Sequence, residues 1–213
     1  MDSQNERVRN LSKQEISAAL TGEKKEILRN NFPPGFLRGE PKLAAVLVPF
    51  LQKDDGWHLL FIRRSRVDGD MHSGQVAFPG GGAEPGDETP EATALRESNE
   101  EIGLHPEHTH ILGRLGTLHT ISNYVITPVV AVLDWPQILT PFPLEVSRIF
   151  TIPLEWLVNA RNHHVEPRTL PGEYPPTQVI YFHEYDGEIL WGATASITLH
   201  LFETLGLTDN PGK

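Results

Sequence analysis

One stretch of this chain, residues 82–104, constrains the fold and the chemistry more than any other. It reads GAEPGDETPEATALRESNEEIGL, which has the form of a loop that runs into a helix. Thr89 is a good N-cap, Pro90 suits the first helical position, and Gly103 is a typical residue just past a helix end. The stretch therefore predicts a helix between Thr89 and Gly103.

Three carboxylates share one face of this predicted helix, because Glu97, Glu100 and Glu101 are three and four residues apart. The apolar residues expected on the opposite, core-facing side are Ala92, Leu95 and Ile102. In a cleft, the repulsion among such crowded carboxylates must be relieved by protonation or by a bound cation. Carboxylate oxygens suit Mg²⁺ or Mn²⁺. A solvated acidic helix face is the alternative interpretation.

Composition narrows the class of protein. The 213 residues are enough for one globular domain with an appendage. A net charge of −10 argues against bulk binding to nucleic acid or to an anionic membrane. The chain has no cysteine, which excludes disulfides and thiol chemistry and fits a cytoplasmic location. The polar start, MDSQNERVRN, predicts no signal peptide, and no apolar run approaches the ~20 residues of a membrane helix.

The chain divides into an N-terminal helical extension, residues 1–40, and a main domain, residues 41–213. We expect residues 1–10 to be disordered and residues 12–31 to be helical, with Ser12 and Glu15 forming a capping box. This helix would cover one edge of the domain. A homodimer contact is the alternative.

The main domain mixes strands with a few helices. Strands are predicted over residues 42–52, 57–63, 75–78, 111–117, 126–133, 146–152, 179–185 and 188–191. Helices are predicted over residues 153–159 and 193–205, with an irregular or hairpin segment over residues 160–177. Because strands and helices do not alternate strictly, the order favours an α+β sandwich.

The spacing within the central stretch matches a known motif, the Nudix box. Its fixed positions are Gly82, Glu88, Arg96, Glu97, Glu100, Glu101 and Gly103. Ser98 stands where the pattern usually has an aliphatic residue, and a small residue should still fit there. The chain thus resembles the Nudix hydrolases. The resemblance implies the Nudix fold, a mixed β-sheet sandwiched between α-helices.

The flanks of the box resemble one subgroup, the coenzyme A pyrophosphatases. The similar segments are HSGQVAFPGG at 72–81, LLFIRRS at 59–65, PLEV at 143–146 and ILWGATA at 189–195. Asp70 departs from the pattern, because the subgroup places an arginine there. Arg63, Arg64 or Arg66 would have to compensate.

The resemblance implies roles for named residues. The expected metal ligands are Glu97, Glu100, Glu101 and the carbonyl of Gly81 or Gly82. The expected catalytic residues are Glu100, Glu101, Arg96 and Glu145, with the general base left open among the glutamates. Arg96 would orient Glu88 or Glu97 by a charged hydrogen bond. The expected substrate-binding residues are Arg63, Arg64, His72 and Gly80. Gly82, Glu88 and Gly103 would be structural.

Other conspicuous side chains have plainer interpretations. The pair His163–His164 is expected at the surface, and Trp191 in the core. Tyr124 or Phe142 could stack an adenine, although aromatic residues at such positions usually pack.

The implied reaction is metal-dependent hydrolysis of a pyrophosphate bond in a nucleoside diphosphate derivative. Coenzyme A or acyl-coenzyme A would give (acyl-)4′-phosphopantetheine and adenosine 3′,5′-bisphosphate. The alternatives are hydrolysis of ADP-ribose, another nucleotide sugar or a nucleoside triphosphate, and a Nudix-fold nucleotide-binding module without turnover.

Overall fold

The structure is a computed structural model that describes residues 2–21, 39–67, 69, 72–169 and 175–208. The later part of the predicted N-terminal helix, most of the linker and Asp70 lie outside the described residues. In the part of the chain that is described, no helix is long and apolar enough to cross a membrane.

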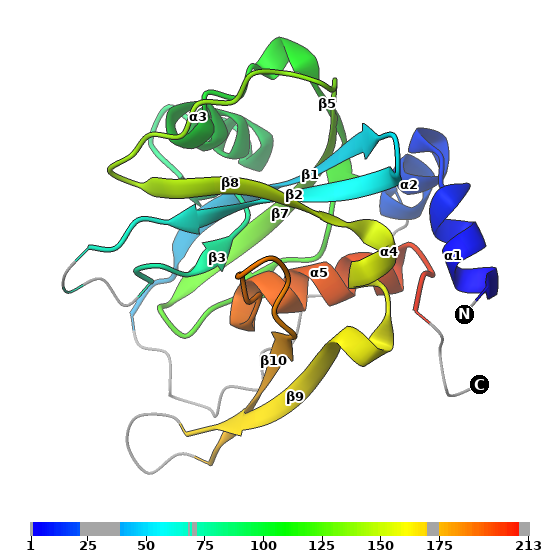
Figure 1. Ribbon diagram of the computed structural model, residues 1–213. Helices are drawn as coiled ribbons and strands as arrows, with labels where there is room; N and C mark the ends of the chain where they lie inside the picture. Colours follow the sequence, from blue (N-terminus) through cyan, green and yellow to red (C-terminus); the bar gives the residue numbers. More distant parts are fainter. Residues whose placement is uncertain (1, 22–38, 68, 70–71, 170–174, 209–213) are drawn as a thin grey trace.

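A mixed sheet forms the centre of the molecule, with eight strands among the described residues (Figure 1). They are β1 (Lys42–Lys53), β2 (Gly56–Arg64), β3 (Val76–Ala77), β4 (Gly80–Gly82), β5 (Thr109–Arg114), β6 (Leu118–His119), β7 (Tyr124–Leu133) and β8 (Val146–Pro153). Strand β1 runs parallel to β7, and the remaining pairs are antiparallel. Both kinds of pairing occur, so the sheet is mixed, as predicted.

Helices cover both faces of this sheet (Figure 1). The helical segments are α1 (Asp2–Arg9), α2 (Lys13–Leu20), α3 (Pro90–Ile102), η1 (Pro106–His108), α4 (Leu154–Leu157), η2 (Ala160–Asn162) and α5 (Gly192–Thr204). Helix α3 lies on one face and α5 on the other. A separate hairpin of β9 (His163–Arg168) and β10 (Thr177–Phe182) extends beyond α5. The predicted α+β architecture is confirmed.

The glycine-rich segment fills the gap where β1 and β2 diverge. Strand β3 pairs with the end of β2, and β4 pairs with the start of β1. Gly80 adopts a φ of 148°, and a Cβ atom there would lie 2.3 Å from the carbonyl oxygen of Ala45. Only glycine fits this close approach, so the segment can cross from one strand to the other in a short span.

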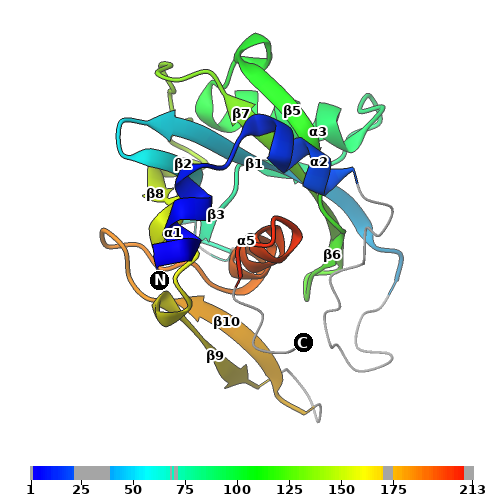
Figure 2. The same ribbon diagram turned by 90° about the vertical axis from the view of Figure 1, so that its right-hand side faces the viewer.

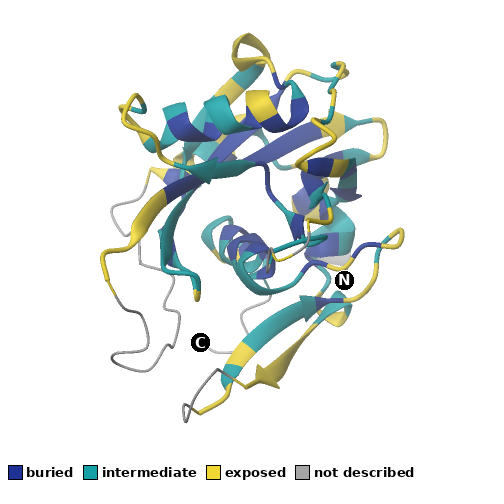
Figure 3. Cartoon of the chain, turned by 90° about the vertical axis from the view of Figure 1, so that its left-hand side faces the viewer, coloured by how far each residue is buried: buried dark blue, intermediate teal, exposed yellow. Residues whose placement is uncertain are grey.

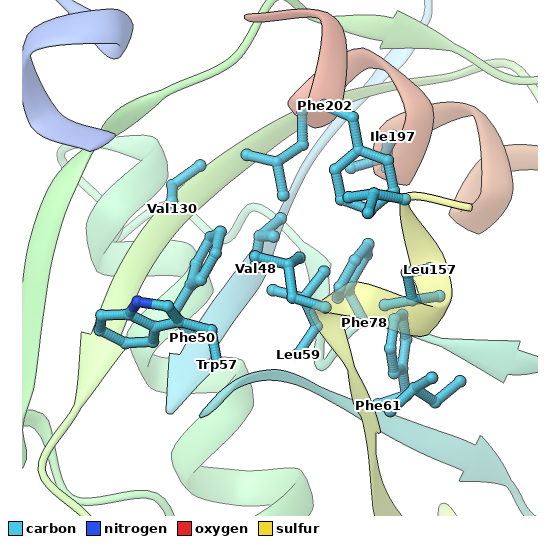
Figure 4. Close-up of a cluster of buried hydrophobic side chains, with 14 of the residues drawn as sticks. Val48, Phe50, Trp57, Leu59, Phe61, Phe78, Val130, Leu157, Ile197 and Phe202 are labelled. Atoms are coloured by element: carbon cyan, nitrogen blue, oxygen red, sulfur yellow. The ribbon is translucent and has the colours of Figure 1, made fainter. Parts of the chain in front are cut away.

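Two apolar cores lie on the two faces of the sheet. The first joins β2 and β7 to α5 and α4, and Figure 4 shows Phe61 and Phe78 stacked within it. The second lies under α3 and includes Leu47, Leu60 and Ile102. Figure 3 shows the buried strands between the two helical layers. Because both faces of β1 are covered, its sequence is a nearly continuous apolar run.

The N-terminal helices pack against the domain (Figure 2). Residues 1–10 are predicted to be disordered, and this is wrong: α1 is a helix whose Val8 is 1% exposed. The Gln4 amide donates to the backbone carbonyls of Val158 and Leu207 at 3.2 and 2.6 Å. Tertiary contacts therefore stabilise a helix that its polar sequence does not predict.

Helix α2 begins as predicted and covers one sheet edge. Ser12 and Glu15 form both bonds of the capping box. Leu20 contacts β5 at Gly113, and Ser17 Oγ donates to the carbonyl of Leu112 at 3.2 Å. This geometry agrees with an edge-covering helix, and the homodimer contact stays a prediction.

The C-terminal strands differ from their predicted bounds. The strand predicted over 179–185 is β10, which ends at Phe182. The strand predicted over 188–191 is wrong, because only single bridges from Tyr185 to Glu188 and from Tyr181 to Trp191 form there. Asp186 and Gly187 form a two-residue turn with φ values of 52° and 79°, which closes the Tyr185–Glu188 bridge but is not followed by a regular ladder.

Candidate active site on helix α3

Helix α3 has the predicted ends. Thr89 Oγ1 accepts a hydrogen bond from the backbone N–H of Ala92 at 3.2 Å, and Pro90 occupies the first turn. Gly103 adopts a left-handed φ of 65°, and its N–H bonds to the carbonyl of Asn99 at 2.9 Å. These local signals fix where the helix starts and stops, and so fix the register of its carboxylates.

The buried face of α3 differs from the prediction. Ile102 is buried and Leu95 packs against the core under α3, as predicted, but Ala92 is only half-buried. Ala94 and Ser98 are fully buried and are not predicted to face the core. The helix is rotated so that its apolar stripe runs through residues spaced by four. Ser98 fits into the core, as expected of a small residue at its position in the box.

Glu101 is the most buried of the three helix glutamates, with a side chain that is 2% exposed. Its Oε2 accepts a hydrogen bond from the backbone N–H of Gly80 at 2.9 Å. Arg64 Nη1 lies 3.7 Å from its Oε1. Burial raises the pKa of Glu101 to about 7, although the Gly80 N–H and Arg64 oppose the shift. A further positive charge nearby would stabilise the ionised form of this carboxylate.

Glu97 lies against the glycine strand, with a side chain that is 17% exposed. A Cβ atom on Gly81 would be 2.4 Å from Glu97 Oε2, so the carboxylate touches the bare backbone of β4. Burial raises the pKa of Glu97, and the charges of Glu100 and Glu145 add to the effect. The Glu145 charge also raises the pKa of Glu101. Glu145 itself is exposed, and its backbone N–H bonds to the carbonyl of Phe142, whose own N–H bonds to the carbonyl of Glu101.

Glu100 does not join the other two carboxylates. Its side chain is 57% exposed and lies 3.3 Å from Arg96 Nη1, an ion pair at i,i+4 spacing. The predicted cluster is therefore partly assembled: Glu97 and Glu101 both contact β4, whereas Glu100 is exposed beside Arg96.

Arg96 links the helix to the loop before it. It bonds to Asp87 Oδ2 and Glu97 Oε1, each at 3.0 Å, and to the carbonyl of Gly82 at 2.9 Å. The predicted link from Arg96 to Glu97 is present, but the loop partner is Asp87, and Glu88 is exposed to solvent. The hydrogen bonds from Arg96 hold the pKa of Asp87 well below its ordinary value.

Sequence reasoning missed Asp87 because the box pattern directs attention to the next residue. The sequence does contain a signal for Asp87, because it follows a glycine in a segment typical of a turn. In the structure its Oδ2 accepts the N–H of Glu84 at 2.9 Å and so holds that turn.

The two arginines predicted to bind substrate point in opposite directions, because side chains alternate along a strand. Arg64 lies beside Glu101, whereas Arg63 pairs with Glu188 on the other face of β2 at 3.2 Å. Glu188 is 3% exposed and also bonds Arg148 at 3.0 Å. Arg63 is thus held in an ion-pair network around the buried carboxylate of Glu188, which sequence reasoning did not foresee.

The remaining predicted residues shape the surroundings. His72 Nδ1 lies 3.3 Å from Gln75 Oε1, in the turn before β3. Trp191 is predicted in the core and is instead half-buried, stacked on Tyr181 at 5.7 Å with Arg168 on its ring. Trp191 is the residue that immediately precedes α5, and it forms a single bridge to Tyr181.

The other aromatic and histidine predictions have mixed outcomes. Phe142 is 43% exposed, and the half-buried ring of Tyr124 has Lys42 over it at 5.7 Å. His164 is exposed as predicted, whereas His163 is half-buried.

The donor chemistry of this site fits a divalent cation. Among the described residues, no three His, Asp or Glu side chains gather closely enough to hold a metal by themselves. However, Glu97 and Glu101 present hard oxygen ligands, and burial raises the pKa of both. A nearby cation would lower those pKa values and stabilise the charged pair.

The fold and this geometry together define a class: an α+β protein whose acidic helix packs against a glycine strand and presents donor groups that fit a divalent cation. The NUDIX domain family model matches residues 41–172. The chain belongs to this family and is a Nudix hydrolase. It is 37% identical over 165 residues to the uncharacterized Nudix hydrolase NudL of Photorhabdus laumondii, a match that covers 78% of this chain and 86% of the relative.

A second relative and two solved structures are also similar to this chain. The chain is 33% identical to a NudL of Yersinia pestis, over 77% of this chain and 80% of that protein. A Nudix hydrolase from M. Smegmatis, RenU, has a TM-score of 0.53 at 18% identity, covering 83% of this chain and 92% of that chain. A MutT/nudix family protein from Enterococcus faecalis has a TM-score of 0.51 at 15% identity, covering 96% and 73%. These two structures show the shared fold.

Proposed function

We propose that this Nudix hydrolase cleaves the pyrophosphate bond of coenzyme A or acyl-coenzyme A, giving (acyl-)4′-phosphopantetheine and adenosine 3′,5′-bisphosphate. Nudix hydrolases act on small nucleotide substrates and generally use divalent metal ions. The coenzyme A assignment is supported by the segments at 59–65, 72–81, 143–146 and 189–195, which flank the box. The cysteine-free composition is compatible with the cytoplasmic location that we propose.

The observation that carries the proposed chemistry is the carboxylate pair on β4. We assign Glu97 and Glu101 as metal ligands, with Mg²⁺ or Mn²⁺ as the ion and the carbonyl of Gly81 or Gly82 as a further donor. When bound, the ion would activate water and neutralise phosphate charge. Glu100 would complete the ligand set by leaving Arg96, a small rearrangement for an exposed side chain.

The remaining residues of the chain have supporting roles in this proposal. Glu145 acts as the distal ligand or base, a role suggested by the segment at 143–146 and supported by the effect of its charge on the pKa of Glu97 and Glu101. Arg64 contacts a substrate phosphate, since it lies beside the pair and its side chain is 34% exposed. Arg63 is engaged by Glu188, so the proposal does not depend on it.

The substrate is tested with a panel of coenzyme A, dephospho-coenzyme A, ADP-ribose, NADH and dNTPs, each with Mg²⁺ and with Mn²⁺. Product masses identify the bond that is cleaved. Selectivity for coenzyme A over its dephospho form supports the proposal, because it shows that the 3′-phosphate is read. Faster hydrolysis of ADP-ribose or of a dNTP contradicts the coenzyme A assignment and favours the alternative substrates.

The site is tested with Glu101→Gln and Glu100→Gln. Each change removes a charge that we assign to metal binding, so turnover should fall by orders of magnitude, by about 10²-fold or more. Glu107→Gln is the matched control, because its exposed side chain lies in η1, outside the site. Normal turnover in the α3 variants would refute the assigned roles.

A further inference from the structure

Strands β2 and β8 lose their one-to-one register at a single point. Ile62 pairs with Ile149 and Arg63 pairs with Arg148, but Arg64 pairs with Val146. Ser147 is therefore an extra residue in β8. Such a bulge re-aims the side chains beyond it and is common next to active sites.

The Ser147 side chain holds this bulge. Its Oγ donates to the carbonyl oxygen of Arg63 at 3.1 Å, with the carbonyl of Arg64 at 3.4 Å. A bulge disrupts the local ladder and leaves backbone groups to find other partners. The serine hydroxyl supplies a donor to the facing strand at the point where the ladder is interrupted.

The bulge changes which face of the sheet the following residues occupy. In a regular strand Val146 would share the face of Arg148 and Phe150, because side chains alternate. Instead Val146 is 1% exposed in the core under α3, on the same side as Ile149. The extra residue therefore turns the start of β8 towards the helix that carries the carboxylates.

Glu145 is fixed by this turn. Its carbonyl accepts the Ser65 N–H at 2.8 Å, and its own N–H bonds to the carbonyl of Phe142 at 2.9 Å. The Phe142 N–H in turn bonds to the Glu101 carbonyl at 2.8 Å. The backbone of Glu145 is thus tied both to the end of β2 and to α3.

We infer that Ser147 is a positioning residue for the hydrolytic reaction: its hydroxyl holds the β8 bulge that directs Glu145 towards Glu97 and Glu101. This inference rests on the proposed function, because it gives Ser147 an effect only through Glu145. Ser147 itself touches no reacting group. A serine is suited to the task, because its short hydroxyl reaches the adjacent strand's carbonyl.

The test compares Ser147→Ala, Ser147→Thr, Glu145→Gln and the double variant Ser147→Ala/Glu145→Gln. The assay uses the substrate of the panel that the wild type hydrolyses fastest. We expect Ser147→Ala to lower kcat by roughly tenfold with little change in KM, since small misplacements of catalytic groups cost this much or more. Ser147→Thr keeps the hydroxyl and should restore turnover. In the Glu145→Gln background, Ser147→Ala should cause no further loss.

Ser17→Ala is the matched control, because Ser17 also donates its hydroxyl to a backbone carbonyl but lies on α2, against β5. A second measurement needs no substrate: amide exchange at Ser65 should speed up in Ser147→Ala and not in Ser17→Ala.

Unchanged kcat and unchanged Ser65 exchange in Ser147→Ala would overturn the inference. An equal loss of kcat in the wild-type and Glu145→Gln backgrounds would also overturn it, because the serine would then act independently of Glu145. Full turnover in Glu145→Gln would instead refute the role proposed for Glu145, and Ser65 exchange would still decide whether Ser147 holds the bulge.

Discussion

At the residue scale, the Glu97 carboxylate lies directly against the backbone of Gly81. A Cβ atom at Gly81 would lie 2.4 Å from Glu97 Oε2, far inside van der Waals contact. Gly81→Ala should therefore displace the carboxylate and lower kcat by about 10²-fold, with metal affinity falling as well. Activity and Mn²⁺ titration measure both effects.

Gly86→Ala serves as the control for that change, because a Cβ atom there meets nothing within 4 Å. Wild-type activity in Gly81→Ala would show that Glu97 can move aside without loss, and would remove it from the ligand set.

Ser98 supplies a stability prediction at the same scale. The side chain is fully buried, and its Oγ has no hydrogen-bond partner in the described part of the structure. A buried unsatisfied polar group costs about 1–3 kcal/mol. Ser98→Ala should raise the free energy of unfolding by about 1 kcal/mol, measured by urea denaturation, whereas Ser17→Ala should lower it. A less stable Ser98→Ala would mean that the hydroxyl is satisfied in solution.

At the element scale, His163 in the β9–β10 hairpin should make the stability of the fold depend on pH. The ring of His163 lies 5.3 Å from that of Phe182. Burial lowers the pKa of His163 below its ordinary 6.5, and the charges of His164 and His183 lower it further. The unfolded chain therefore takes up this proton first as the pH falls.

The sign of the effect follows from that order of protonation. The contribution of His163 to the free energy of unfolding should decrease as the pH drops below about 6.5, and this decrease should level off below the folded-state pKa. Urea unfolding at about pH 8 and about pH 5.5 measures it. His163→Leu should remove this contribution, so the difference in unfolding free energy between the wild type and the variant should change between the two pH values. A pH dependence identical to that of the wild type would contradict the assignment.

At the scale of the whole molecule, the N-terminal helices are part of the main core. Ile16 is completely buried against the domain, so Ile16→Ala should cost about 2–5 kcal/mol. Ile138 is 87% exposed, and Ile138→Ala should change stability by less than about 0.5 kcal/mol. Thermal or urea denaturation compares them, and equal effects would show that the extension is dispensable for folding.

The sequence by itself determined the elements whose signals are local. Thr89, Pro90 and Gly103 place both ends of α3, because caps act over a few residues. The turn at Asp54–Gly56 between two apolar runs likewise predicts the β1–β2 hairpin. The spacing of the box residues brings the right residue types onto one helix.

Only the tertiary structure decided which of the box side chains are buried together and which stay in solvent. Strand β4 and the core under α3 decide which carboxylates of the helix are buried. Glu97 contacts β4, whereas Glu100 stays exposed beside Arg96. The helix α1 and the bulge at Ser147 depend on partners more than 80 residues away in the chain. Local sequence patterns do not contain such long-range contacts, because their energy appears only once the sheet has formed.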